Sequence, residues 1–236
     1  DFFQLLLTAF LGMSLYYLFF TYSLKFISAS LSSLICSMIP IFTLLADSLI
    51  NNKKPKKLTI ILFLISIFGV YLVIDVNLEG DSLLAIIKGI LLMLFAITSW
   101  ITYTIKAEYL LSEYNSIVVL AYQCILGSSI SLVFAFGQIS SLKNIFQSPD
   151  IKLIILNIIF VSIVATALGY FFYNLGIKYV GVTISSAYMN TMPAITIIAS
   201  YFLLNSTITY KKIMGVTIVI LATLKIAFKD KKISAL

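Results

Sequence analysis

Two stretches of the sequence decide the fold: KFISASLSSLICSMIPIFT at residues 25–43 and KYVGVTISSAYMNTMPAIT at residues 178–196. Aligned end to end, they share a first lysine, a Ser-Ser pair, a proline and a last threonine. Each matched pair is 153 residues apart, as Pro40 and Pro193 are. Generic apolar similarity does not place a lysine, two serines and a proline in one register. We therefore interpret the chain as an internal duplication.

The same spacing extends beyond the two stretches. It relates Tyr17 to Tyr170 upstream and Asn52 to Asn205 downstream, with no gap across three apolar runs. Residues Gly89–Phe136 have no partner, because their counterparts would precede residue 1. We therefore predict a five-helix unit that occurs twice, with the first two helices of the first copy absent from this chain. An odd number of helices inverts one unit relative to the other, which is a recurring plan of secondary transporters.

The composition is that of an integral membrane protein. The chain has 236 residues, of which 61% are hydrophobic and 11% charged, and its mean hydropathy is +1.09. A soluble domain has about a quarter of its residues charged. Apolar runs of about 20 residues, enough to cross a bilayer as a helix, recur along the whole length. Open sheets are excluded because backbone groups cannot pair with water in hydrocarbon, and the runs are too continuous for barrel strands.

The predicted fold is all-α: a polytopic membrane bundle of eight transmembrane helices, from a five-plus-five inverted repeat that lacks its first two helices. The spans are expected at residues 2–24, 28–50, 58–74, 89–105, 117–136, 153–177, 182–204 and 213–227. Residues 1–76 then hold the last three helices of the first repeat, 82–229 the complete second repeat, and 230–236 a cytoplasmic tail. Cys36 and Cys124 lie inside apolar runs and indicate no disulfide framework.

The placement of the lysines predicts orientation and location. The formal net charge is +7, but the lysines lie between apolar runs, where they orient a membrane protein rather than bind nucleic acid. With the Lys53–Lys57 cluster in the cytoplasm, the acidic loop Asp75–Asp81 falls outside and both ends of the chain fall inside. All sixteen basic residues are lysine and isoleucine is abundant, which is typical of an AT-rich bacterial genome. We expect a multi-pass protein of the bacterial cell (inner) membrane. Its expected partner is the lipid bilayer, and no nucleic acid is expected to bind.

Both copies show the same order of features: a short loop, a helix that starts with small hydroxyl residues, a mid-helix proline, a polar break and a closing helix with glycine. The segments are LKFISASLSSLICSMIPIFTLLADSLI with ISIFGVYLVI, and IKYVGVTISSAYMNTMPAITII with IMGVTIVILA. This arrangement resembles the EamA-type drug/metabolite transporters over essentially the whole chain. The resemblance implies ten helices in two inverted halves and transport of small metabolites, amino acids or drugs. Members often carry a Glu-Arg pair after the proline helix, whereas these positions read Lys53-Lys54 and Ser206-Thr207 here.

Polar residues inside the apolar spans are the candidates for a substrate cavity. Pro40 and Pro193 each free a backbone carbonyl one turn earlier and kink the helix, although a kink can serve packing alone. Gln123 and Asn190 are costly to leave facing lipid and are the strongest candidates. Serine and threonine can instead bond to their own helix, and tyrosine and tryptophan can form an interfacial belt. The predicted cavity comprises Tyr17, Thr21, Ser33, Ser37, Pro40, Ser99, Trp100, Tyr103, Gln123, Thr166, Tyr170, Tyr173, Asn174, Ser186, Asn190 and Pro193.

The predicted function is transport of a small organic solute by alternating access, in the direction of efflux, and not enzymatic catalysis. The chain has no histidine and no pair of buried carboxylates, so the sequence predicts no metal and no cofactor. No ionisable residue is expected at the bilayer centre, where proton-coupled carriers keep a carboxylate. A facilitator for neutral or zwitterionic solutes and coupling through the absent helices both stay open, as does a homodimer. An inactive fragment or a non-transporting scaffold is the alternative, ahead of an intramembrane enzyme.

Overall fold

The structure is a computed structural model, and it describes residues 1–52, 54–73, 82–135, 150–192, 195 and 209–231. Within these ranges every regular element is helical, which confirms the all-α class. Five helices are long and apolar enough to cross a membrane: Phe2–Ser23, Leu31–Ile50, Leu83–Glu113, Ser116–Ala135 and Ile151–Met189. The count of eight spans stays a prediction, because much of the expected span 182–204 lies outside the described residues. The acidic loop and Pro193 lie outside them too.

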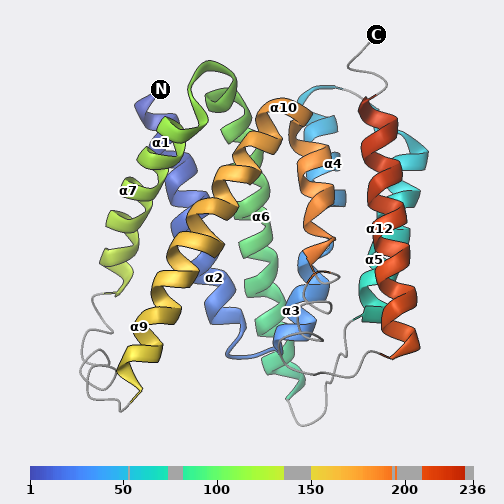
Figure 1. Cartoon of the computed structure of the whole chain (residues 1–236), viewed down its shortest axis with the longest axis horizontal. Coiled ribbons are helices and arrows are strands. Elements are labelled where there is room, and N and C mark those ends of the chain that lie inside the picture. Colours follow the sequence, from blue (N-terminus) through green and yellow to red (C-terminus); the bar gives the residue numbers. More distant parts are fainter. Residues whose placement is uncertain (53, 74–81, 136–149, 193–194, 196–208, 232–236) are drawn as a thin grey trace.

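Several helical segments adjoin one another along the chain, and others are single continuous helices. The first two groups of adjoining segments are α1 (Phe2–Ala9) with η1 (Phe10–Leu15) and α2 (Tyr16–Ser23), and α3 (Ala29–Cys36) with α4 (Ile39–Ile50). The next three are single helices, α5 (Lys57–Val73), α6 (Leu83–Glu113) and α7 (Ser116–Ala135). They are followed by α9 (Ile151–Phe160) with η3 (Val161–Leu168) and α10 (Gly169–Met189), and by α12 (Tyr210–Lys231). Figure 1 shows a bundle in which α1 begins and α12 ends at the same face, as expected for two ends on one side of the membrane.

The central helix α6 is longer than predicted. It runs for 31 residues, whereas the sequence indicated only Gly89–Ile105. At a rise of about 1.5 Å per residue it is about 46 Å long, which exceeds the hydrocarbon thickness of about 30 Å. Its ends therefore project from the bilayer. At its start, Ser82 caps the first turn by accepting a hydrogen bond from the Ala85 amide. Lys88 and Lys106 marked the predicted ends because they are charged, yet both lie on the continuous helix.

The predicted kink at Pro40 is confirmed as a break in the helix. α3 ends at Cys36, a turn occupies Ser37 and Met38, and α4 begins at Ile39 with the proline in its first turn. In the second copy, α10 ends at Met189 and a turn occupies residues 190–191 before helix resumes at residue 192. The two breaks therefore lie in the 153-residue register found in the sequence.

Two π-helical segments follow the same register, although the sequence analysis did not predict them. η1 ends at Leu15 and η3 ends at Leu168, again 153 residues apart. A π-helical turn carries an extra residue and disturbs the regular i→i−4 bonding, and such segments are frequent at functional sites. Both segments lie in the helix that precedes the broken helix of their copy.

The chain reverses direction inside α10 at Gly181. This residue has a φ of +81°, which is a left-handed conformation that glycine adopts without strain. Figure 1 shows α10 rising to one end of the bundle and returning beside α4 and α12. The reversal brings the polar residues before Gly181 and those after it into the same bundle interior.

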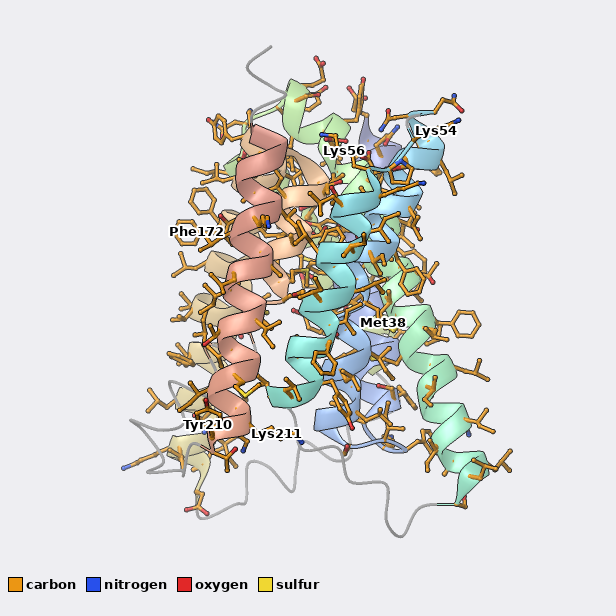
Figure 2. The ribbon with its side chains drawn as sticks, turned by 90° about the vertical axis from the view of Figure 1, so that its right-hand side faces the viewer. Met38, Lys54, Lys56, Phe172, Tyr210 and Lys211 are labelled. Carbon is orange, nitrogen blue, oxygen red and sulfur yellow. The ribbon has the colours of Figure 1, made fainter. Side chains whose placement is uncertain are left out.

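Glycines allow α5 and α12 to pack with their backbones close together. A Cβ atom on Gly215 would lie 2.6 Å from the backbone oxygen of Gly69. Small residues at such positions are how membrane helices approach each other. Figure 2 shows Lys56, just before α5, at one end of the bundle, and Tyr210, the first residue of α12, at the other. The two helices are therefore antiparallel.

Candidate functional site

A cavity of about 260 Å³ lies where the two broken helices meet α2. Both breaks contribute to it, through Ser37 between α3 and α4 and through Asn190 at the end of α10. These two residues occupy equivalent positions in the 153-residue register. The described residues that line it are Tyr16, Phe20, Leu24, Ser33, Cys36, Ser37, Met189, Asn190 and Met192.

Asn190 is the polar group of this cavity whose hydrogen bonding is incomplete. The residue is 1% exposed, and its Nδ2 donates to the Ser66 hydroxyl on α5 at 3.0 Å. Its Oδ1 has no hydrogen-bond partner in the described part of the chain. A buried polar atom without a partner costs about 1–3 kcal/mol. The Oδ1 is therefore an unused acceptor, within the described part of the chain, on a residue that lines the cavity.

The opposite break supplies hydroxyl oxygens. The Ser37 hydroxyl donates to the Leu34 carbonyl at 2.6 Å, which leaves its oxygen able to accept. Pro40 has no N–H and cannot donate to the Cys36 carbonyl one turn earlier. The proline is itself buried and contributes through this effect on the backbone, because it does not line the cavity.

An aromatic cluster adjoins the cavity through Tyr16. Trp100 lies at its centre, with ring centroids 5.0 Å from Tyr16, 5.3 Å from Tyr103, 5.5 Å from Tyr170 and 5.3 Å from Tyr173. The Trp100 indole Nε1 is buried, and no group that the structure describes accepts a hydrogen bond from it. The cluster is thus an apolar wall that still carries an unused donor.

A chain of buried hydrogen bonds runs behind the aromatic cluster and ties four helices together. The Tyr103 hydroxyl donates to Asn174 Oδ1 at 2.8 Å, and Asn174 Nδ2 donates to Gln123 Oε1 at 3.4 Å. Gln123 Nε2 then donates to the Thr8 hydroxyl at 3.2 Å, which donates to the Leu5 carbonyl. Tyr103, Gln123, Asn174 and Thr8 are all fully buried. The side chains of Gln123 and Asn174 therefore hold helices together, and neither residue is among those that line the cavity.

Two tyrosines of α10 use their hydroxyls to hold neighbouring helices. The Tyr170 hydroxyl donates to the Gly12 carbonyl in η1 at 2.6 Å. The Tyr173 hydroxyl lies 3.1 Å from the Thr104 hydroxyl and 3.3 Å from the Ser186 hydroxyl. Tyr173, which precedes Gly181, therefore connects its part of α10 both to α6 and to the part of α10 that follows Gly181.

The structure divides the predicted site residues into three groups. Ser33, Ser37 and Asn190 line the cavity. The aromatic cluster and the hydrogen-bonded interior next to it contain Trp100, Tyr103, Gln123, Tyr170, Tyr173, Asn174 and Ser186. The remainder lie elsewhere or outside the described residues: Tyr17, Thr21, Pro40, Ser99, Thr166 and Pro193.

The third group contributes in other ways. Tyr17 is 37% exposed and packs its ring edge-on against Tyr16. The exposed Thr21 hydroxyl donates to the Tyr17 carbonyl of its own helix. Ser99 is buried in α6, and Thr166 lies in η3.

Sequence reasoning missed most of the apolar and sulfur-bearing lining. Tyr16, Phe20, Leu24, Cys36, Met189 and Met192 line the cavity and were not among the predicted residues. The register contained a usable signal, because Cys36 and Met189 precede Ser37 and Asn190 in the two copies. Ser66, the partner of Asn190, carried no such signal.

None of the lining residues that the structure describes has a charged side chain. Among the described residues, no group of three or more histidine, cysteine, aspartate or glutamate side chains could hold a metal ion. These described lining residues can offer hydrogen bonds, aromatic faces and thioether or thiol sulfur to a ligand, but no formal charge.

The fold and the cavity together define a multi-pass membrane protein with a small polar site between broken helices. The model of the EamA-like transporter family matches residues 1–75 and 87–228, and the chain belongs to this family. The resemblance predicted from the sequence is thereby confirmed, and the protein is a membrane transporter.

The names of two relatives agree with this assignment. An "uncharacterized transporter" of Archaeoglobus fulgidus is 25% identical over 210 residues, which cover 89% of this chain and 72% of the relative. The "uncharacterized transporter YyaM" of Bacillus subtilis is 26% identical over 215 residues, which cover 88% and 67%. A solved structure titled "Crystal structure of protein" matches with a TM-score of 0.77 over 97% of this chain and 77% of its own. At 11% identity this last likeness concerns the fold alone.

Proposed function

We propose that the protein moves a small organic solute without net negative charge across the cell membrane by alternating access, in the direction of efflux. The solute binds in the cavity between the two helix breaks. The observation that carries this proposal is Asn190, which lines the cavity and whose buried Oδ1 has no hydrogen-bond partner among the described residues. Intramembrane polar groups mark substrate pathways because they are costly to keep in hydrocarbon.

The size and chemistry of the cavity favour a metabolite over a large drug. Drug-sized ligands occupy pockets of about 300–1,000 Å³, and this cavity measures about 260 Å³. A net anion would lose its hydration without gaining a cationic partner. An ammonium group is better served, since Asn190 Oδ1 can accept its hydrogen bond and the Tyr16 and Phe20 rings can offer their faces. Amino acids and flat organic cations are therefore the first solutes to test.

The duplication supports alternating access. The helix breaks and the π-helical segments recur at the 153-residue spacing, and the family matches, 1–75 and 87–228, lie close to the proposed repeats 1–76 and 82–229. Two inverted units that meet at one site can exchange conformations, which opens the site to either side in turn. The described lining residues include no carboxylate that could couple transport to an ion, so the proposal names no coupling ion.

Alkylation of the native Cys36 tests the site directly. Cys36 lines the cavity, whereas Cys124 on α7 does not, and both are free thiols of intermediate exposure. We expect a transported solute to slow modification of Cys36 by N-ethylmaleimide several-fold and to leave Cys124 unchanged. The solutes to add are ethidium and neutral amino acids, with transport of the same compounds followed in proteoliposomes. Transport without protection of Cys36 would place the binding site elsewhere, and neither effect with any solute would favour a non-transporting scaffold.

A further inference from the structure

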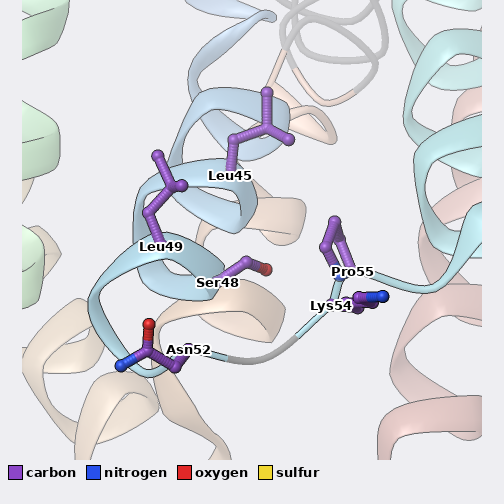
Figure 3. Close-up of a pocket in the computed structure, with 6 residues that line it drawn as sticks. All are labelled: Leu45, Ser48, Leu49, Asn52, Lys54 and Pro55. Atoms are coloured by element: carbon purple, nitrogen blue, oxygen red, sulfur yellow. The ribbon is translucent and has the colours of Figure 1, made fainter.

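A second, separate groove lies at the end of α4, where the chain turns towards α5. It has a volume of about 450 Å³ and is lined by Leu45, Ser48, Leu49, Asn52, Lys54 and Pro55. Figure 3 shows Ser48 on the side of α4 that faces the segment with Lys54 and Pro55. Asn52 makes this corner possible with a φ of +50°, a left-handed conformation that asparagine tolerates better than most residues. None of these residues lines the cavity at the helix breaks.

The polar side of the groove is basic. Lys54 is exposed, and no acidic side chain that the structure describes pairs with it. The sequence from Asp47 to Lys57 contains four lysines and one aspartate, and Asp47 accepts a hydrogen bond from Asn51 at 2.7 Å. The carbonyl end of α4 disfavours an anion here, but the amide end of α5 begins three residues after Lys54 and acts in the opposite direction. The net field therefore attracts negative charge.

The other side of the groove is apolar and faces outward from the bundle. Leu45 is 38% exposed and Leu49 is 79% exposed, one turn apart on the same face of α4. They belong to a helix that is apolar enough to cross the membrane, and they precede the lysines along the chain. A ligand that fills this groove must therefore present hydrocarbon next to leucine and a negative group next to lysine and serine.

The second repeat carries its lysines at other positions, because Lys211 and Lys212 lie in the first turn of α12. The positions 153 residues after Lys53 and Lys54 are Ser206 and Thr207, and the position after Asp47 is Ser200. In the predicted topology the Lys53–Lys57 cluster lies on the cytoplasmic side of the membrane, where anionic headgroups gather.

We propose that this groove binds one anionic phospholipid, with the headgroup phosphate on Lys54 and Ser48 and an acyl chain along Leu45 and Leu49. The lysine favours an anionic lipid over a zwitterionic lipid because it attracts net negative charge. The two leucines favour a lipid over a free phosphate ion because they can contact an acyl chain. A lipid bound there would join the end of α4 to the start of α5. It would thereby hold the corner that connects the broken helix to the antiparallel α5–α12 pair.

Native mass spectrometry of the purified chain in detergent tests this proposal. The chain is titrated with dioleoyl phosphatidylglycerol and, separately, with dioleoyl phosphatidylcholine. We expect tighter binding of phosphatidylglycerol, and Lys54→Gln should weaken it about fivefold, as expected for the loss of one lysine next to an anionic lipid. Leu49→Ser should weaken binding as well, because an acyl chain loses its contact. Lys152→Gln is the matched control, since Lys152 is an exposed lysine in the first turn of α9; it should leave the affinity unchanged.

Several results would overturn the proposal. Equal affinity for the two lipids, or equal losses in Lys54→Gln and Lys152→Gln, would reduce the effect to general surface charge. Two results together would indicate a phosphate site that does not bind the acyl chain: millimolar inorganic phosphate displaces bound phosphatidylglycerol, and Leu49→Ser has no effect on binding. Each variant is accepted only if its melting temperature stays within about 3 °C of the parent chain, so that an unfolded corner is not mistaken for a lost ligand.

Discussion

Replacing Asn190 with alanine separates a role in transport from a role in packing. The change removes one intramembrane hydrogen bond, to Ser66, and such bonds are worth about 0.6 kcal/mol on average. It also removes the buried Oδ1 that has no partner, which offsets that loss. We expect a change in unfolding free energy below about 1 kcal/mol and a melting temperature within about 3 °C of the parent protein. A substrate ammonium group that bonds to Oδ1 would lose about 1.5–3 kcal/mol, which weakens binding by a factor of about 10 or more.

Gln123→Ala is the contrasting variant. It removes two buried hydrogen bonds, leaves Asn174 Nδ2 without its acceptor and the Thr8 oxygen without its donor, and opens a small void. These losses predict about 2–4 kcal/mol of destabilisation, or about 4–16 °C in melting temperature. Thermal unfolding in detergent and uptake of ethidium and radiolabelled neutral amino acids by proteoliposomes measure both quantities. Unchanged transport kinetics in Asn190→Ala would refute the assignment of Asn190 to the substrate site.

Three further predictions concern orientation, chain organisation and packing. On a background without native cysteines, a cysteine at position Lys54 should react only from the cytoplasm and one at Glu79 only from outside; the opposite pattern would invert the predicted topology. The reading frame upstream of residue 1 should encode two helices resembling Gly89–Phe136, which genomic sequencing would establish or exclude. Gly215→Ala should lower the melting temperature by several degrees, because the new Cβ would lie 2.6 Å from a backbone oxygen of α5. Gly169→Ala, with open space around its Cβ position, should not lower it.

The register of the repeat was the most informative property of the sequence. It paired Pro40 with Pro193, and the same spacing separates the two helix breaks, at Ser37 and at Asn190. A proline and a polar residue inside an apolar run carry a local physical signal, because each disturbs a helix or costs free energy in hydrocarbon. This is why the positions of the breaks could be predicted.

The partners of the polar residues could not be predicted in the same way. Gln123 and Asn190 look alike in the sequence as lone amides within apolar spans. Only the packing of α1, α7 and α10 shows that Gln123 has partners on both sides, whereas Asn190 keeps one free acceptor. The π-helical segments left no trace either, since η1 and η3 read as ordinary apolar helix.

The exposed face of α9 is what the proposed repeat predicts. α9 has no buried residue in the structure, whereas its counterpart, the helix of α1 and η1, packs on α7 through Thr8 and Ser14. Under the 153-residue register, the helix that should cover α9 corresponds to α7 and would precede residue 1. The exposed Asn157 of α9 supports the same reading, because an amide facing lipid is costly. We infer that an upstream helix packs on α9 as α7 packs on α1.

The two tyrosines at equivalent positions differ in a way that bears on transport. Tyr170 donates to the Gly12 carbonyl in η1, and its counterpart Tyr17 could make the symmetric bond to η3. Tyr17 is instead 37% exposed, and within the described residues its hydroxyl donates no such bond. Under the alternating access proposed above, the two conformational states differ in which of these two equivalent bonds is formed. The structure has the bond from Tyr170. If the two bonds exchange during transport, each π-helical segment offers its carbonyl to the opposite repeat in turn, and the cavity between the helix breaks opens to alternate sides.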